Sequence, residues 1–300
     1  MLRIQYFNGG LANQVFQYIF YRFNEIRHPE KDVWFLDDSF FYFKKEHNGY
    51  ELERIFGVKP NLLSSQFDPA AWDAIIKVRR EGKSVAEFFR NAGMPVIMLA
   101  ETDNYKQTNQ FNGQLYHIPA NEFHPEITEL NLPTDHILYY HGYWINREWF
   151  HTYRDILMEE LQFPGITEPH NQKYAAEIKN SFSVGVHIRR GDYVTLGWNM
   201  ETEFYRSASK QMLENVPDLT YFVFSDDINW CKENAEALGL TLARNIIYVE
   251  GNTGESSFRD LQLMTMCNGL IMSNSAFCYL AALLNPRLSL FVNPSPVRKI

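Results

Sequence analysis

The sequence predicts an α/β protein with a parallel, doubly wound sheet, and three observations support this prediction. In the second half of the chain, short apolar runs alternate with longer segments of helical periodicity. The chain opens with a strand-like run at 3–7, a Gly9-Gly10 turn and an amphipathic helix. Its 300 residues are enough for two domains of about 150 residues each. Because strands that alternate with helices usually pair in parallel, we expect a doubly wound arrangement.

The individual elements follow from apolar spacing and from helix and turn signals. The first helix is predicted from Asn13, because apolar residues from Val15 to Phe23 recur on one face. The segment 163–169 contains two prolines and a glycine, and it divides the chain into domains 1–165 and 166–300. Further helices are predicted at 69–80, 84–91, 150–161, 203–215, 227–238 and 256–267. Further strands are predicted at 96–100, 137–140, 184–188, 221–224, 246–249 and 270–272.

Composition excludes several classes of protein. A net charge of −8 argues against a nucleic-acid partner, which would require a basic face. Three widely spaced cysteines without a Cys-x-x-Cys pair indicate core thiols in a reducing compartment. The longest apolar segment, 269–284, is interrupted by polar residues, and the first residues do not form a signal peptide, so we expect a soluble, cytoplasmic protein. Aromatic residues make up 15% of the chain, which suits either a large core or a sugar-stacking surface.

The most informative segment is His187-Ile-Arg-Arg-Gly-Asp192, which follows a predicted buried strand. Ligands of open α/β sheets bind at the carboxyl ends of strands. The planar guanidinium forks of Arg189 and Arg190 match phosphate oxygens, so a pyrophosphate is the expected ligand. The alternative is a solvated turn that holds a local ion pair.

Three further segments lie at predicted strand ends and could share one nucleotide site. Gly9-Gly-Leu-Ala-Asn-Gln14 leads into a helix and could hold an anion there, or be a plain turn. Phe224-Ser-Asp-Asp227 could accept hydrogen bonds from guanine, or cap a helix. Ser273-Asn-Ser-Ala-Phe277 could donate to phosphate, or cap the next helix. Neither Asp37-Asp38 nor Asp226-Asp227 has the Asp-x-Asp spacing of metal-dependent enzymes, so we predict no metal.

These segments give the sequence its resemblance to a known family. The chain resembles the α-1,2-fucosyltransferases, which belong with the α-1,6- and protein O-fucosyltransferases that share a His-x-Arg-Arg-x-Asp motif. The matching segments, in the expected order, are 9–18, 142–150, 186–193 and 260–267 continuing to 273–277. Two departures occur: Ala12 stands where the family usually has glycine, and Cys278-Tyr-Leu-Ala281 replaces the usual tryptophans and glycine.

The resemblance implies the GT-B architecture, in which two Rossmann-like domains face across a cleft, with GDP-L-fucose as the donor substrate and no cofactor. It also implies inversion at the anomeric carbon without a metal. Arg189 would bind the β-phosphate and stabilise the leaving GDP, and Arg190 would support the loop. The other implied donor contacts are His187 with Asp226 or Asp227 at guanine, Asn13 near the donor, and Asn274 and Ser275 in the phosphate pocket.

The predicted activity is therefore transfer of L-fucose to the 2-hydroxyl of a terminal β-galactoside. Asp192 is the first candidate for the base, ahead of Glu201, unless its carboxylate only pairs with an arginine and orders the loop. Alternatives are a transferase for another GDP-sugar and a catalytically silent glycan-binding protein. An α/β hydrolase is disfavoured because the chain has no Gly-x-Ser-x-Gly elbow. Acceptor recognition is expected around 104–124 and 141–149.

Bacterial members of the family suggest the biological setting by analogy. They decorate lipopolysaccharide or other surface glycans from the cytoplasmic side, so a lipid-linked glycan is a further expected acceptor. Peripheral contact with the membrane is left open by the sequence.

Overall fold

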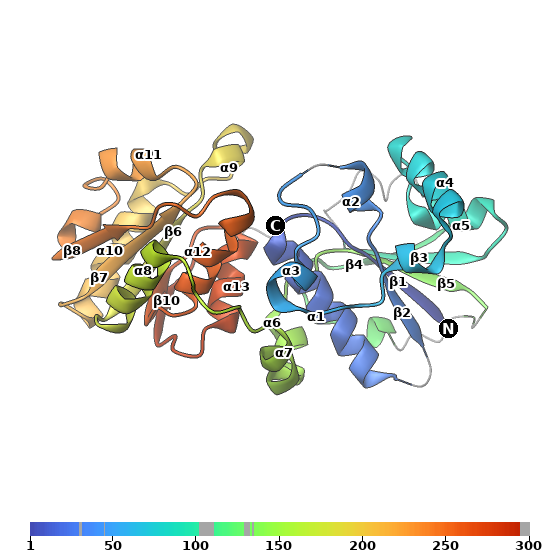
Figure 1. The fold of residues 1–300 in the computed structure, drawn as a ribbon, viewed down its shortest axis with the longest axis horizontal. Helices are drawn as coiled ribbons and strands as arrows, with labels where there is room; N and C mark the ends of the chain where they lie inside the picture. Colours follow the sequence, from blue (N-terminus) through green and yellow to red (C-terminus); the bar gives the residue numbers. More distant parts are fainter. Residues whose placement is uncertain (30–31, 45, 102–110, 129–132, 134, 295–300) are drawn as a thin grey trace. The chain divides into compact units, whose positions relative to one another are not determined.

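The computed structural model describes the chain except for residues 30–31, 45, 102–110, 129–132, 134 and 295–300. The chain divides into two compact units, Met1–Gln162 and Phe163–Ile300. The proline- and glycine-containing segment 163–169 predicts a boundary after residue 165, which lies in the same loop between the units. Among the described residues, each unit holds one parallel sheet of five strands (Figure 1). The α/β class and the parallel pairing predicted from the sequence are therefore confirmed.

The sheet of the first unit has the order β2-β1-β5-β3-β4. Its strands are β1 (Leu2–Tyr6), β2 (Val33–Asp37), β3 (Val96–Glu101), β4 (Gln114–Ile118) and β5 (Ile137–His141). β1 pairs with β2 on one side and with β5 on the other, so the direction of winding reverses beside β1. The carboxyl ends of β1 and β5 therefore flank the switch point, where α/β sheets bind their ligands.

Helices of the first unit follow the predicted signals in most places. They are α1 (Leu11–Arg27), α2 (Phe40–Phe43), α3 (Leu52–Phe56), α4 (Pro69–Arg80), α5 (Val85–Asn91), α6 (Arg147–Thr152) and α7 (Arg154–Glu160). Asp68 caps α4 by accepting the Ala71 N–H at 2.9 Å, and Ser84 begins α5 with a capping box. The predicted single helix over 150–161 is wrong. Asn146 caps α6 earlier, and Tyr153 leaves helical geometry with φ −126° and ψ 39°, which separates α6 from α7.

The sheet of the second unit has the order β10-β9-β6-β7-β8. Its strands are β6 (Ser183–Ile188), β7 (Thr220–Ser225), β8 (Asn245–Tyr248), β9 (Gly269–Ile271) and β10 (Leu290–Val292). Read from β8 to β10, these strands are the third, second, first, fourth and fifth of the unit in chain order, which is the Rossmann order. β6 pairs with β7 on one side and with β9 on the other, so the switch point lies between β6 and β9.

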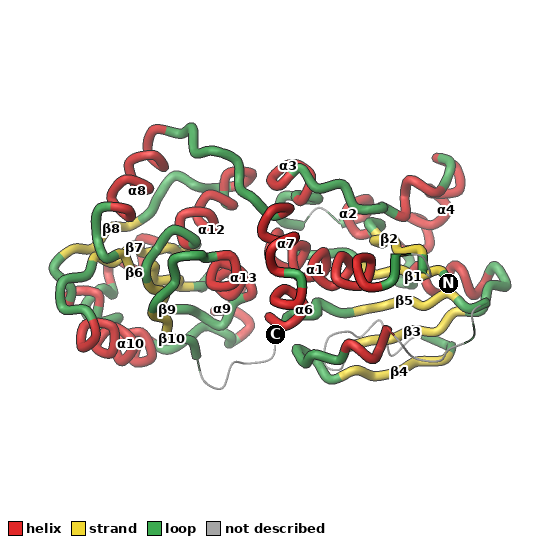
Figure 2. The backbone as a smooth tube through the Cα atoms, turned by 90° about the horizontal axis from the view of Figure 1, so that it is seen from below, coloured by secondary structure: helices red, strands yellow, loops and turns green. Residues whose placement is uncertain are grey.

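Helices alternate with the strands along the second unit (Figure 2). They are α8 (Pro169–Lys179), α9 (Gly191–Leu196), α10 (Thr202–Asn215), α11 (Ile228–Glu233), α12 (Phe258–Met264) and α13 (Ala276–Leu284). α11 and α12 are shorter than predicted, because turns replace the last residues expected for α11 and a 3₁₀ turn at Gly254–Ser256 precedes α12. The three cysteines are free thiols inside this unit. None of the described helices is both long enough and apolar enough to cross a bilayer.

Candidate active site

The switch point of the second unit carries the predicted nucleotide-binding residues. β6 ends with His187 and Ile188, and Ser273 follows the end of neighbouring β9. The Nδ1 atom of His187 lies 2.7 Å from the Ser273 hydroxyl, so a side-chain hydrogen bond joins the ends of the two strands. The His-x-Arg-Arg segment and the Ser-Asn-Ser segment, far apart in sequence, therefore meet where this sheet class binds ligands.

Two carboxylates hold the guanidinium of Arg189. Its Nη1 atom lies 2.8 Å from Asp226 Oδ2, and its Nη2 atom donates to Asp192 Oδ1 at 2.7 Å. The side chain remains 32% exposed. A guanidinium has five N–H donors, and these two contacts occupy two of them. Arg189 is thus fixed in position at the strand end while part of its fork faces outward.

Arg190 is arranged differently and supports the loop. Its Nε atom donates to Asp227 Oδ2 at 3.2 Å, and its guanidinium carbon lies 3.6 Å from the centre of the Trp230 ring. Its backbone N–H donates to Asp226 Oδ1 at 2.8 Å. Stacking on an aromatic ring and pairing with a carboxylate are the contacts of a structural arginine. The local ion pairs that the sequence left as an alternative are therefore present, and they surround a strand end.

Gly191 is required between the arginines and Asp192 for a steric reason. A Cβ atom at this position would lie 2.6 Å from Asp226 Oδ2, closer than side chains approach. Asp226 is the common anchor, because its two oxygens bind the Arg189 side chain and the Arg190 backbone. The glycine of the motif thus allows the loop after β6 to approach the loop after β7.

His187 is a buried, neutral imidazole. Burial, with a contribution from the positive charge of Arg189, lowers the pKa of His187 to about 3. The ring of Phe277 lies 5.7 Å away at a 32° tilt. The hydrogen bond to Ser273 fixes the orientation of the ring, so one nitrogen has a defined partner at neutral pH.

The remaining polar residues after β7 and β9 also cap helices. Asp227 Oδ1 accepts the Trp230 N–H at 3.2 Å, and Ser275 Oγ accepts the Phe277 N–H at 3.3 Å. Both capping interpretations are therefore confirmed, and neither excludes a ligand. Asn274 is 5% exposed, and its Oδ1 atom has no hydrogen-bond partner among the described residues. Such a buried acceptor is a candidate for a ligand contact.

Asn13 belongs to the first unit, whereas the other predicted site residues belong to the second. It lies in the first turn of α1, just after the end of β1. Gly9 has φ +82°, and a Cβ atom there would lie 2.8 Å from Asn13 Nδ2. The side chain of Gln14 donates to the Gly9 carbonyl at 2.9 Å and fixes the turn. The double glycine therefore makes a tight turn that places Asn13 at the carboxyl edge of this sheet.

The sequence interpretation missed a buried carboxylate, Glu101, at the end of β3. Glu101 is 2% exposed. Its side-chain oxygens accept the backbone N–H groups of Tyr143 at 2.7 Å, Trp144 at 3.0 Å and Asn121 at 3.1 Å. Trp144 is buried with φ +56°, which is unusual for a bulky residue. Glu101 thus holds the loops after β4 and β5, which belong to the region expected to recognise the acceptor; residues 104–110 of that region lie outside the described residues.

Asp260 on α12 was quoted in a matching segment but was given no role. Its carboxylate accepts a 2.7 Å hydrogen bond from Asn252 Nδ2. Burial raises the pKa of Asp260 to about 7. Within the described ranges, His, Cys, Asp and Glu side chains form no group of three or more that could hold a metal ion.

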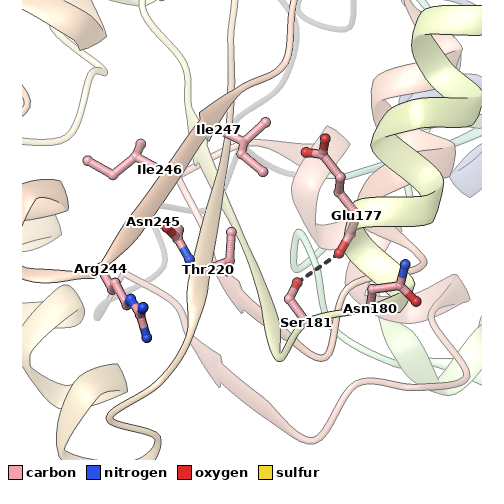
Figure 3. A pocket seen from close by; sticks show the side chains of 8 residues that line it. All are labelled: Glu177, Asn180, Ser181, Thr220, Arg244, Asn245, Ile246 and Ile247. Carbon is pink, nitrogen blue, oxygen red and sulfur yellow. Dashed lines mark hydrogen bonds between the residues drawn. The ribbon is translucent and has the colours of Figure 1, made fainter.

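A surface cavity of about 500 Å³ lies at the amino-terminal ends of the strands of the second sheet (Figure 3). It is lined by Glu177, Asn180, Ser181, Thr220, Arg244, Asn245, Ile246 and Ile247. Thr220 and Asn245 begin β7 and β8, whereas the arginine loop follows the end of β6. This cavity is therefore separate from the candidate site.

Two Rossmann-like units, with paired arginines at a strand end of the second, agree with the GT-B-like glycosyltransferase class that the sequence predicts. The chain belongs to glycosyl transferase family 11, whose family model matches residues 101–296. The resemblance based on the His-x-Arg-Arg-x-Asp motif is thereby confirmed.

Three curated relatives illustrate the similarity. An alpha-1,2-colitosyltransferase of Escherichia coli is 32% identical over 52% of this chain and 54% of the relative. The O-antigen biosynthesis glycosyltransferase WbnK of Escherichia coli is 22% identical over 93% of this chain and 88% of its own. The galactoside alpha-(1,2)-fucosyltransferase 2 of Bos taurus is 29% identical over 48% of this chain and 44% of the relative. The match thus spans about half the length of the first and third relatives.

Solved structures share the fold at low sequence identity. The fucosyltransferase NodZ from Bradyrhizobium matches 95% of this chain and 93% of its own with a TM-score of 0.51 and 13% identity. A mutant FUT1 of Arabidopsis thaliana in complex with GDP matches 99% of this chain and 71% of its own with a TM-score of 0.50 and 11% identity. These likenesses concern the fold alone.

Proposed function

We propose that this protein transfers L-fucose from GDP-β-L-fucose to the 2-hydroxyl of a terminal β-galactoside, with inversion and without a metal or other cofactor. The observation that carries the proposal is the Arg189 guanidinium, held by Asp192 and Asp226 at the end of β6. Such a preorganised cation suits a pyrophosphate. The names of the family 11 relatives support the α-1,2 linkage.

In the proposed reaction, the acceptor hydroxyl attacks the anomeric carbon of fucose as its bond to the β-phosphate oxygen breaks. GDP leaves with the bonding electron pair, and the hydroxyl proton passes to a base. Negative charge therefore grows on the β-phosphate, where Arg189 stabilises it. Because Arg189 is already held by two carboxylates, little reorganisation is needed at the transition state.

Asp192 is the proposed base, with Glu201 as the second choice. The Asp192 side chain is 56% exposed, which leaves it accessible, but it also pairs with Arg189 at 2.7 Å. The pairing supports the alternative that Asp192 only orients the arginine. The two functions differ in their kinetic consequences, because only loss of a base slows the proton transfer itself.

The other donor contacts are proposed as follows. Asn274 and Ser275 line the phosphate pocket, and the buried Oδ1 atom of Asn274 supports this assignment. His187 contacts guanine together with one aspartate. Asp227 is better placed than Asp226 for guanine, because its side chain is 43% exposed against 27%. Asn13 is proposed as a further donor contact, and the first unit as the acceptor-side domain.

A second donor deserves a direct test because a colitosyltransferase is among the relatives. We propose GDP-L-fucose first, with GDP-L-colitose as the alternative. Incubating the protein with lactose and each donor, followed by NMR of the product, distinguishes them. An α-linked fucosyl residue on the galactose 2-hydroxyl supports the proposal. Exclusive transfer of colitose, or a different linkage, contradicts it.

The natural acceptor is proposed to be a β-galactoside within a surface glycan, such as a lipid-linked lipopolysaccharide precursor. The O-antigen function in the name of WbnK supports this choice. A cytoplasmic location with peripheral membrane contact belongs to the same proposal.

A further inference from the structure

One tryptophan is exposed beside the arginine loop. Trp34, Trp72, Trp144 and Trp149 are buried, and Trp230 is half-buried beneath Arg190. Trp198, which follows α9, is instead 44% exposed. Val194 and Leu196, on the same short helix, are 47% and 50% exposed. Three apolar side chains are therefore exposed within five consecutive residues next to the arginine loop, and Trp198 is the only aromatic one among them.

The backbone holds Trp198 in a defined place. Gly197 ends α9 with φ +67°, a conformation that favours glycine. The N–H of Trp198 then donates to the carbonyl of Tyr193 at 2.8 Å. The indole ring meets the Tyr193 ring at 86° with centres 5.6 Å apart. An edge-to-face contact of this kind covers at most one face of the indole.

A chain of contacts connects Trp198 to the proposed catalytic arginine. The guanidinium of Arg189 lies 5.4 Å from the centre of the Tyr193 ring, which in turn contacts Trp198. The Tyr193 hydroxyl also lies beside Ser275, one of the residues proposed for the phosphate pocket. The exposed indole therefore lies one aromatic ring beyond the anion site and is continuous with it.

We propose that Trp198 is a stacking platform for the pyranose ring of the acceptor. This inference rests on the proposed function, because the acceptor must approach the fucose attached to the β-phosphate near Arg189. A galactose ring has an apolar face of C–H groups, which packs favourably on an exposed aromatic face. The platform binds the sugar by an apolar contact and leaves its hydroxyl groups available for attack.

The test compares variants at Trp198 with a matched control. Trp198→Ala removes the ring, Trp198→Phe keeps an aromatic face, and Phe291→Ala removes an exposed aromatic side chain from β10 (Phe291 is 57% exposed). We expect Trp198→Ala to raise KM for lactose about tenfold, the order expected for the loss of one buried aromatic contact. The KM for lactose of Trp198→Phe should stay within about threefold of the wild-type value, and that of Phe291→Ala should be close to it. Calorimetric Kd values for GDP should stay within about twofold in all three variants.

Each other outcome has a defined meaning. An unchanged KM for lactose in Trp198→Ala, with GDP still bound, overturns the platform. A parallel loss of GDP binding also overturns it, because Trp198 would then only order the arginine loop. If the wild-type protein sediments as a dimer and Trp198→Ala as a monomer, the exposed indole serves self-association and the platform is overturned. If the wild-type protein binds GDP but transfers no sugar to any galactoside, the proposed function fails before the variants are compared, and this inference fails with it.

Discussion

Arg189 and Asp226, which follow the neighbouring strands β6 and β7, form an ion pair of 2.8 Å. The pair joins two loops that are separated by more than thirty residues of sequence. It orients the guanidinium before any ligand arrives, so the anion site is preorganised. The account of the site depends on this arrangement, and the first three predictions test it.

Replacing Arg189 should mainly slow the transfer step. We expect Arg189→Ala to lower kcat by about 10²–10³-fold, because the charge that develops on the β-phosphate loses its main donor. Arg189→Lys should restore little of the lost kcat, because an ammonium group cannot bind both aspartates and a phosphate as the guanidinium fork does. Steady-state kinetics of GDP release measure both effects. The matched control is Arg244→Ala, in the cavity at the amino-terminal ends of β7 and β8. Equal losses of kcat in the two variants would refute the role of Arg189.

Asp192→Asn separates a base from a positioning residue. If Asp192 is the base, kcat should fall by about 10²–10⁴-fold on this change. The measurement is kcat for lactose at neutral pH, with the wild-type protein as the reference. Turnover near the wild-type value would leave pairing with Arg189 as the function of Asp192.

Gly191→Ala should disrupt the loop that carries both arginines. The added Cβ would lie 2.6 Å from Asp226 Oδ2, so the anchor of the loop has to move. We expect GDP affinity to fall at least tenfold. The free energy of unfolding, measured with urea, should change by no more than about 1 kcal/mol, because α9 has no buried residues. Gly165→Ala, where a Cβ meets nothing within 4 Å, is the control. Tight GDP binding by Gly191→Ala would show that the loop tolerates displacement of Asp226.

His187 should make stability depend on pH. An unfolded histidine has a pKa of about 6.5, whereas burial and the charge of Arg189 lower the pKa of native His187 to about 3. Between these values the unfolded state binds more protons, so the free energy of unfolding falls as the pH drops. Between pH 7 and pH 4.5, the free energy of unfolding should fall by about 2–3 kcal/mol less in His187→Gln than in the wild-type protein. Urea titrations at both pH values give the difference, and parallel losses would contradict a neutral, buried His187.

Glu101→Ala should destabilise the first unit. The change leaves three backbone N–H groups without their acceptor and opens a cavity beneath Gly142. We expect a loss of about 3–5 kcal/mol, from the unsatisfied donors together with the lost packing. Chemical denaturation measures the loss, with Glu122→Ala, an exposed neighbour, as the control. A loss below 1 kcal/mol, the range of an ordinary surface substitution, would contradict the buried anchor.

The sequence predicts those parts of the fold whose signals are local. The bounds of α4 follow from Asp68, the proline after it and the basic residues of its last turn. Strands β2, β4 and β10 were missed; all three are short, lie at sheet edges and are partly exposed, so their signals are weaker than those of the central strands. The break at Tyr153 was missed because α6 and α7 together preserve helical periodicity across it.

The site could be predicted as a set of residues but not as a set of contacts. The arginines, His187 and Asn274 are recognisable because each lies at or just after the end of a strand. The pairing of Arg189 with Asp226 is not recognisable in this way, because it depends on the register of β6 against β7. Glu101 was missed for a related reason: its partners are backbone groups in two distant loops, which leave no side-chain pattern in the sequence.

The decisive experiment measures release of GDP from GDP-L-fucose in EDTA, with and without lactose. We predict saturable release that depends on lactose, continues in EDTA, and falls by at least two orders of magnitude in Arg189→Ala. Binding of GDP without lactose-dependent release would retain the donor site and contradict the proposed acceptor. A protein that does not bind GDP at all would contradict the account of Arg189 and of the site around it.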